Sequence, residues 1–219
     1  MIEKSRKIIG LGHPRCGTGF TSYLLSAAGL KIGHERRHAD GNVSWLSVSE
    51  RSVTPWGNGH HRPLKDTDYV FCAVRSMVAA IPSVMAENRV EGSLKFRRDI
   101  LMNYYGIDIT NGKDVPQNEI SVALAGMTLW YELCLTKKPE FIFRIDRPED
   151  DEKLNHHFNI EVSRSSISKR NSRPKLKQDI NFSHEMLDIV SVRWLKRSAE
   201  LSRKIGYDND ASTFLDVLK

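Results

Sequence analysis

The sequence predicts an α/β protein in which helices flank a mainly parallel central sheet, in a three-layer α/β/α arrangement. One observation behind this is the order of segments, because short apolar runs rich in β-branched residues alternate with longer segments of helical composition. A second is that these runs end at glycines or charged residues, of the kind found at the carboxyl ends of parallel strands. The 219 residues, 40% of them hydrophobic, suffice for a well-buried core, so we expect one domain over residues 1–219.

The first predicted elements are a strand, a helix and a second strand. Residues 7–11 (KIIGL) predict a short buried strand, because the run is too brief for a helix and is bounded by glycine. Residues 18–28 predict a helix with apolar side chains along one face. Residues 30–33 (LKIG) predict another short strand, which places His34 and Glu35 at its end.

The clearest strand lies further along the chain, at residues 68–74 (DYVFCAV). Its continuous run of β-branched and aromatic residues is typical of a parallel strand buried on both faces, and Arg75 ends it. The preceding residues 36–66 are rich in Gly, Ser, His and Arg, which predicts loops, with a short helix within residues 41–50.

Helices dominate the rest of the predicted order. Residues 76–89 have helical composition, but Pro82 either kinks this helix or marks its start, because a proline inside a helix removes a hydrogen bond. Residues 89–118 are hard to assign, and the basic, serine-rich residues 162–177 predict a loop. A strong amphipathic helix, a short strand and a long closing helix are predicted at residues 120–138, 141–146 and 185–207.

The composition narrows the functional classes. The net charge of +6 favours an anionic ligand, but without an aromatic and basic stripe we expect no nucleic-acid partner. No apolar run approaches the roughly 18 residues of a membrane span, and we expect neither a span nor a secretion signal. The three cysteines are scattered and lack the spacing of a zinc site, so we expect a cytoplasmic protein with no disulfides and no metal.

Residues 12–19 (GHPRCGTG) join the first strand to the first helix, and they predict a phosphate-binding loop. Gly17 and Gly19 let backbone N–H groups approach an anion closely, and the helix N-terminus adds a partial positive charge. Arg15 adds a planar, permanently charged donor. The GxxxxGK[ST] signature is missing, which disfavours triphosphate hydrolysis with Mg²⁺ and favours a single phosphate. The alternative is a plain strand-to-helix turn that contains glycines.

Residues 13–20 resemble the 5′-phosphosulfate-binding loop of sulfotransferases, which usually reads Pro-[Arg/Lys]-Ser-Gly-Thr-[Thr/Ser]. Here Cys16 replaces the serine, and Gly19 replaces the last hydroxyl residue. Arg75 at the end of a strand, with Ser83 two helical turns later, looks like the 3′-phosphate motif of that family. The later segments FIFRIDRPED and IGYD are similar to the late strand and the terminal helix of the family.

The resemblance implies a P-loop NTPase-like fold and a sulfuryl donor, 3′-phosphoadenosine 5′-phosphosulfate (PAPS), with no metal. It implies that Arg15 stabilises charge on the oxygen that leaves with the 5′-phosphate. It also implies a base that activates the acceptor, for which we favour Glu35, with His34 as its alternative or partner. The nucleotide-binding residues that it implies are Arg15, Cys16, Gly17, Thr18, Gly19, Phe20, Arg75, Ser83 and Arg170.

Other interpretations stay open. Two rival functions are a nucleotide or small-molecule kinase and a non-catalytic nucleotide-binding protein that retains the fold. A nucleophilic role for Cys16 is disfavoured, because phosphatases of the Cys-x5-Arg type need an arginine where Ser22 stands. Trp45 is expected to be a packing residue, and stacking on a glycan is the open alternative because Trp45 flanks the predicted pocket. The acceptor is a glycan or a small molecule by family analogy alone, and the sequence does not specify the oligomeric state.

Overall fold

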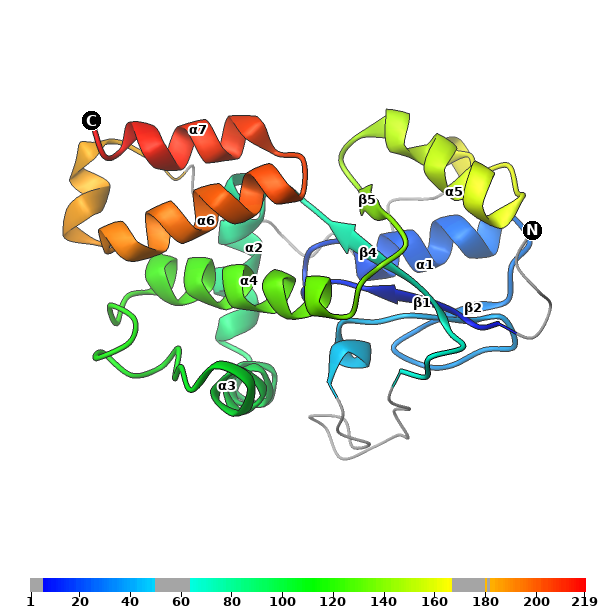
Figure 1. Cartoon of the computed structure of the whole chain (residues 1–219), viewed down its shortest axis with the longest axis horizontal. Coiled ribbons are helices and arrows are strands. Elements are labelled where there is room, and N and C mark those ends of the chain that lie inside the picture. Colours follow the sequence, from blue (N-terminus) through cyan, green and yellow to red (C-terminus); the bar gives the residue numbers. More distant parts are fainter. Residues whose placement is uncertain (1–5, 50–63, 167–179, 181) are drawn as a thin grey trace. The chain divides into compact units, whose positions relative to one another are not determined.

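The computed structural model describes residues 6–49, 64–166, 180 and 182–219 (Figure 1). Its contacts divide the chain into two compact units, Met1–Arg75 with Leu133–Arg173, and Ser76–Glu132 with Pro174–Lys219. The first unit contains the sheet, and the described elements of the second are helical. The single domain expected over residues 1–219 stays a prediction. No helix in the described part of the chain is long and apolar enough to cross a membrane.

The described strands form one five-stranded sheet in which every pairing is parallel. The spatial order is β2-β3-β1-β4-β5, with the strand that precedes the glycine-rich loop at the centre. This confirms the predicted α/β fold with a parallel central sheet. The strands are β1 (Ile8–Leu11), β2 (Ile32–His34), β3 (Gly41–Val43), β4 (Tyr69–Val74) and β5 (Ile142–Arg144).

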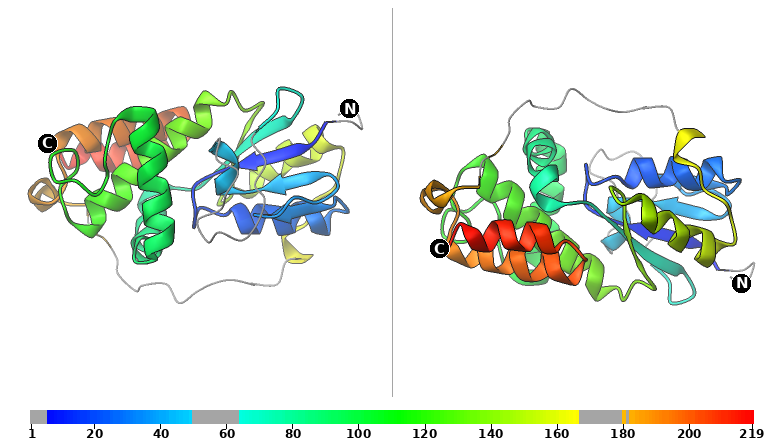
Figure 2. Two further views of the ribbon diagram at one scale, coloured as in Figure 1. Left: turned by 90° about the horizontal axis from the view of Figure 1, so that it is seen from below. Right: turned by 90° about the horizontal axis from the view of Figure 1, so that it is seen from above.

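Two helices pack on one face of the sheet and build its main core. They are α1 (Thr18–Ala27) and α5 (Asp151–Phe158), and both run alongside the strands (Figure 2). Leu24 of α1 and Leu154 of α5 share a buried apolar cluster with Phe71 of β4. Burying such side chains is worth about 1.5–3 kcal/mol each, so this face supplies much of the stability of the first unit.

The opposite face of the sheet is also covered by a helix. Neighbouring residues of a strand point to opposite faces, so Cys72 of β4 faces away from Phe71. Cys134 lies in the last turns of α4 (Glu119–Thr136), and burial, together with the Cys72 thiol, raises the pKa of the Cys134 thiol well above its usual range. These cysteines are therefore apolar packing residues, and helical cover on both faces is consistent with three layers.

The strand β3 corrects the prediction of a helix within residues 41–50. Within residues 41–50, only the later part is helical, as the 3-10 helix η1 (Trp45–Val48). Gly41 pairs with Ile8 in the central strand and has a φ of 144°. A Cβ at this position would lie 1.8 Å from the carbonyl oxygen of Ile8, so only glycine allows the two strands to approach. The helical pattern that followed this glycine concealed the strand.

The second unit contains five described α-helices. The helix α2 begins at Met77 and continues through Pro82, so the alternative that it starts near the proline is wrong. Proline has no N–H to donate to the carbonyl of Val78, and the helix tolerates that loss. The helix α2 spans Met77–Asn88. The other α-helices of this unit are α3 (Glu91–Tyr105), the part of α4 up to Glu132, α6 (Val192–Lys204) and α7 (Asp208–Asp216).

The predicted closing helix over residues 185–207 is wrong, because the segment is divided. The 3-10 helix η4 (His184–Asp188) precedes α6, which starts only after Ser191. The carbonyl of Ile189 accepts hydrogen bonds from Asn118 Nδ2 at 2.7 Å and Ser121 Oγ at 2.8 Å. The carbonyl of Ile189 is therefore bonded to residues at the start of α4 and not to a backbone N–H of a following helical turn.

A carboxylate from α7 caps the N-terminus of α2. Asp210 is buried and accepts hydrogen bonds from the backbone N–H of Met77 at 2.6 Å, from that of Val78 at 3.3 Å and from Ser76 Oγ at 2.9 Å. The first N–H groups of a helix lack partners within it, and a negative charge there also complements the helix dipole. This contact ties the last helix of the chain to the first helix of the unit.

We expect Asp210→Ala to lower the free energy of unfolding by about 1–2 kcal/mol, because it uncaps α2. The measurement is denaturant unfolding. Asp208→Ala is the matched control, since Asp208 is an exposed acid in the same first turn of α7. We expect it to cost no more than about 0.5 kcal/mol. Equal losses for the two variants would contradict the capping role.

The turn from β1 into α1 requires glycine. Gly17 has a φ of 94°, and a Cβ there would lie 2.1 Å from Ile145 Cδ1 and 3.1 Å from Ile145 Cγ1, just after β5. The left-handed conformation costs an L-residue about 1–2 kcal/mol, and the clash adds to that cost. The loop is therefore held against β5 by a contact that only the absence of a side chain permits.

We expect Gly17→Ala to lower the free energy of unfolding by about 3 kcal/mol, measured by denaturant unfolding. Gly29→Ala is the matched control, because Gly29 also has a φ of 94° but has no atom within 4 Å of the added Cβ. It should cost only about 1–2 kcal/mol. Adding Ile145→Val to Gly17→Ala should recover part of the difference. Equal losses for the two alanine variants would show that Ile145 does not constrain the turn.

Candidate functional site

The predicted site residues of the first unit gather at one edge of the sheet. In a parallel sheet the carboxyl ends of all strands lie at the same edge, where ligands usually bind. Residues 12–17 follow β1, and His34 and Glu35 lie at the end of β2. Trp45 comes two residues after β3, and Arg75 follows β4 directly. Loops from four strands therefore contribute side chains of the predicted types to this edge.

The loop after β1 leads into a helix N-terminus without a side-chain cap. Arg15 and Gly17 are left-handed, with φ of 68° and 94°, and Gly17 is the N-cap residue. The backbone N–H of Thr21 makes the first helical hydrogen bond, to the carbonyl of Gly17 at 2.9 Å. The N–H groups of residues 18–20 precede that bond and have no acceptor within the helix. With the helix dipole, they form a surface suited to an anion.

Backbone strain is concentrated at this edge of the sheet. Four non-glycine residues in the described part of the chain have positive φ. Lys138 lies two residues after α4 and Asn159 directly follows α5, and such a conformation is common just after a helix. The other two are Arg15 and Glu35, at 68° and 58°. A left-handed non-glycine residue costs about 1–3 kcal/mol, and such residues cluster at functional sites. The strain thus points to the two residues proposed for charge stabilisation and proton transfer.

The side chain of Cys16 lies beneath the loop rather than on its surface. It is fully buried, and its Sγ is 3.8 Å from Nδ1 of His13, which is also buried. The backbone N–H of Cys16 donates to the carbonyl of His13 at 3.1 Å. A thiol in this position packs the turn from below, so contact with a bound anion falls to the backbone and to Arg15.

His34 lies against the first turn of α1. Its Nε2 is 3.3 Å from Thr18 Oγ1, and a Cβ added to Gly19 would lie 3.4 Å from its ring. Burial lowers the pKa of His34, and the nearby Glu35 carboxylate opposes this shift without reversing it. The imidazole is therefore neutral at pH 7. Because the pKa is lower in the folded than in the unfolded state, this group's contribution to stability is lost as the pH falls through the two values.

Glu35 is held by the indole of Trp45. The Nε1–H of Trp45 donates to Glu35 Oε1 at 2.8 Å, and Trp45 is buried. His34 Nε2 is 3.8 Å from the same oxygen, which is too long for a hydrogen bond. Within the described part of the chain, no hydrogen bond reaches Oε2, and the Glu35 side chain is 30% exposed. One carboxylate oxygen is thus held by the indole, and the other has no hydrogen-bond partner among the described residues.

The remaining predicted residues are distributed as follows. Phe20 lies in the first turn of α1, and Arg75 is half-buried at the end of β4. Ser83 lies in α2 of the second unit, so its pairing with Arg75 on a 3′-phosphate stays a prediction. Arg170 lies outside the described residues, as does most of the basic loop predicted at residues 162–177.

Arg164 has a role that the sequence did not reveal. Its guanidinium forms a two-point ion pair with Asp151, at 2.7 Å for each bond, and donates to the backbone carbonyl of Ile145 at 2.8 Å. It also lies over the ring of Phe20, 5.4 Å from the centroid. Arg164 therefore joins α5, the end of β5 and the first turn of α1, and it supports the loop from the side. No spacing rule in the sequence distinguishes it from the other basic residues near it.

A neighbouring ion pair fixes the end of β5. Arg144 donates from Nε and a terminal nitrogen to Asp150, at 2.9 and 2.7 Å, and Lys153 adds a bond at 3.0 Å. Burial disfavours the charged carboxylate, but the hydrogen bonds from Arg144 and Lys153 outweigh it and lower the pKa of Asp150 to about 2. Arg144 is therefore committed to Asp150, which leaves Arg15 as the cation of the loop proposed to meet a phosphate.

The comparisons with known proteins give no family for the chain. A scan against protein-family models, a search of curated proteins and a search of solved structures found no match. Among the residues that the structure describes, no group of three or more His, Cys, Asp or Glu is placed to hold a metal ion. Any functional conclusion therefore rests on the geometry of the site itself.

We expect Glu35→Gln to lower the pKa of His34 further, because the substitution removes the negative charge that favours the imidazolium. The measurement is an NMR titration of the histidine ring resonances. His157 serves as an internal reference, since the charged neighbours that act on it are His156, Glu140 and Lys153. Its pKa should stay unchanged. A His34 pKa that rises or stays constant in Glu35→Gln would contradict the interaction.

Proposed function

We propose that the protein is a sulfotransferase that moves a sulfuryl group from PAPS to a hydroxyl or amine of a glycan or small-molecule acceptor. The observation that carries the proposal is the strained turn at Arg15 and Gly17, which leads into the uncapped N-terminus of α1 with Glu35 and His34 at the same edge of the sheet. This arrangement suits a phosphate next to a proton acceptor. The resemblance of residues 13–20 to the sulfotransferase loop supports the choice of PAPS over other phosphates.

The loop provides charge stabilisation in this proposal. The N–H groups of residues 18–20 bind the 5′-phosphate, and Arg15 neutralises charge on the oxygen that departs with it. Arg75, which follows β4, binds the 3′-phosphate in this proposal. When bound, the donor supplies the sulfuryl group for an in-line transfer, and the protein mainly positions and neutralises charge, as in phosphoryl transfer.

The geometry favours Glu35 over His34 as the base. Glu35 Oε2 is open and takes the proton from the acceptor, while Trp45 holds Oε1. His34 contacts Thr18 and therefore lies on the phosphate side, where its neutral ring orients the loop hydroxyl. The acceptor oxygen or nitrogen forms its bond to sulfur as the bond from sulfur to the bridging oxygen breaks. The electron pair of that bond leaves with the 5′-phosphate.

We expect calorimetric titration with 3′-phosphoadenosine 5′-phosphate to show binding, with much weaker binding of ATP and Mg²⁺. Arg75→Ala should weaken bisphosphate binding by about 1.5–3 kcal/mol, or roughly tenfold to 150-fold, because a charged hydrogen bond is lost. Arg6→Ala is the matched control. Arg6 precedes β1 and pairs with Glu140, at the opposite edge of the same sheet, so its loss should leave binding unchanged.

Other outcomes of the titration would overturn the proposal in distinct ways. Failure of the bisphosphate to bind at high concentration would remove the sulfotransferase function. Tight binding of ATP that depends on Mg²⁺ would favour a kinase. Bisphosphate binding without any transfer from PAPS, including to water, would leave a non-catalytic nucleotide-binding protein.

A further inference from the structure

We propose that Trp45 is a positioning residue that aims Glu35 for proton transfer, by holding Oε1 so that Oε2 faces the acceptor. The catalytic meaning of this inference rests on the proposed sulfotransferase function. The contact itself is a property of the fold. The sequence favoured a packing role for Trp45 over stacking on a glycan, and its burial agrees with packing. Burial does not account for the direction of its indole N–H.

Trp45 is fixed by its surroundings. It begins η1, and the residue before it, Ser44, caps this helix by accepting a hydrogen bond from the N–H of Leu46 at 3.1 Å. The backbone N–H of Ser44 donates to the carbonyl of Gly10 in the central strand at 2.8 Å. Asn42 Nδ2 donates to Ser47 Oγ at 3.0 Å, which closes the turn between β3 and η1. The indole is thus carried by a rigid segment attached to the middle of the sheet.

Glu35 depends on such a partner for its orientation. Its left-handed backbone lies just beyond β2, with its N–H 3.4 Å from the carbonyl of Val43. A carboxylate in this position can rotate about its side-chain torsions, and His34 Nε2 lies 3.8 Å from Oε1 as a competing partner. The 2.8 Å hydrogen bond from Trp45 holds the Glu35 carboxylate in one orientation and keeps it from pairing with His34. Loss of that bond would let the carboxylate turn toward His34 and away from the acceptor.

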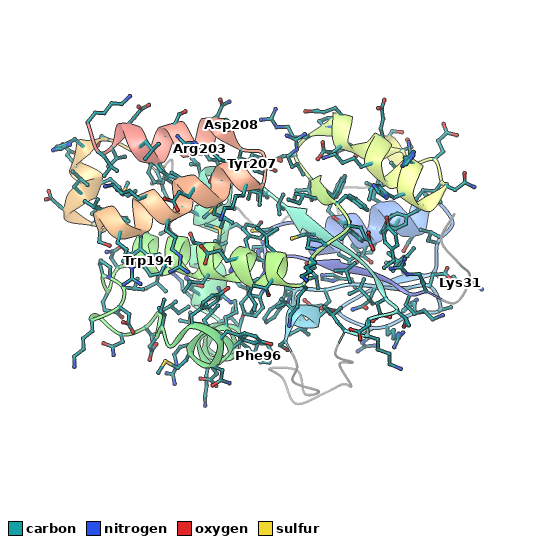
Figure 3. All side chains as sticks on the ribbon, viewed as in Figure 1. Lys31, Phe96, Trp194, Arg203, Tyr207 and Asp208 are labelled. Carbon is teal, nitrogen blue, oxygen red and sulfur yellow. The ribbon has the colours of Figure 1, made fainter. Side chains whose placement is uncertain are left out.

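The matched control is a second buried tryptophan. Trp194, labelled in Figure 3, lies in α6 and is also buried. Its Nε1–H donates to the backbone carbonyl of Asp114 at 3.1 Å. It belongs to the second unit. Trp45→Phe and Trp194→Phe therefore remove the same N–H and the same part of a ring, but only the first removes a donor to Glu35.

The kinetic experiment uses PAPS with water as the acceptor and measures release of 3′-phosphoadenosine 5′-phosphate and sulfate. Water gives a proton to Glu35, its oxygen bonds to sulfur, and the bisphosphate leaves with the electron pair of the broken bond. We expect Trp45→Phe to lower kcat about tenfold with an unchanged affinity for the bisphosphate. Trp194→Phe should leave both properties unchanged.

A spectroscopic measurement tests the contact without activity and without substituting Trp45. In ¹⁵N spectra of the intact protein, the indole N–H resonance of Trp45 should move upfield in Glu35→Gln, since a charged acceptor is replaced by a neutral one. The resonance of Trp194 should not move. An unmoved Trp45 resonance overturns the inference, and so does an active wild type whose kcat is unchanged in Trp45→Phe. A wild type that neither binds the bisphosphate nor turns over PAPS overturns the proposed function instead, and with it the catalytic role of Trp45, even where the resonance confirms the contact.

Discussion

The turn between β1 and α1 must pass against the end of β5, and this steric constraint determines most of the candidate site. Gly17 meets it with a left-handed backbone and no side chain next to Ile145. The position of this turn directs the N-terminus of α1 toward the carboxyl edge of the sheet. It also leaves Cys16 pointing inward, where it is fully buried. Arg164, which bonds the carbonyl of Ile145 and covers Phe20, supports the same junction from the side.

The site adds strain to a sheet that is otherwise regular. Arg15 and Glu35 each adopt a conformation that costs about 1–3 kcal/mol, which persists only where surrounding contacts dictate it. Those contacts belong to the sheet: the strands on either side of β1 are held by close parallel pairing, including the approach of Gly41 to Ile8. The apolar cluster around Phe71 lies between the sheet and its helices and makes the scaffold rigid. A rigid scaffold of this kind can hold two strained residues at one edge.

Local patterns in the sequence were enough to predict the elements that are continuous and apolar. The strand β4 is buried throughout, and its run of residues 69–74 has no other interpretation. The loop at residues 12–19 could also be predicted, because glycines between a strand and a helix leave a local signature. The strand β3 could not, since what makes Gly41 a strand residue is its distant partner Ile8. The hydrogen bond from Trp45 to Glu35 could not be predicted for the same reason, because the position of Trp45 follows from the register of β3.

The contacts of His34 and Glu35 give adjacent residues separate tasks. A hydrogen-bonded histidine and carboxylate would act as one unit, with the carboxylate orienting the ring. Here the two groups are drawn apart, His34 toward Thr18 at 3.3 Å and Glu35 toward Trp45 at 2.8 Å, and 3.8 Å separates them. A neutral imidazole lies next to the turn proposed to bind an anion, and a carboxylate oxygen without a hydrogen-bond partner among the described residues lies beside it. This arrangement suits a reaction in which charge develops on one side and a proton leaves on the other. The separation of the two groups is therefore a better argument for the proposed transfer than the presence of either residue alone.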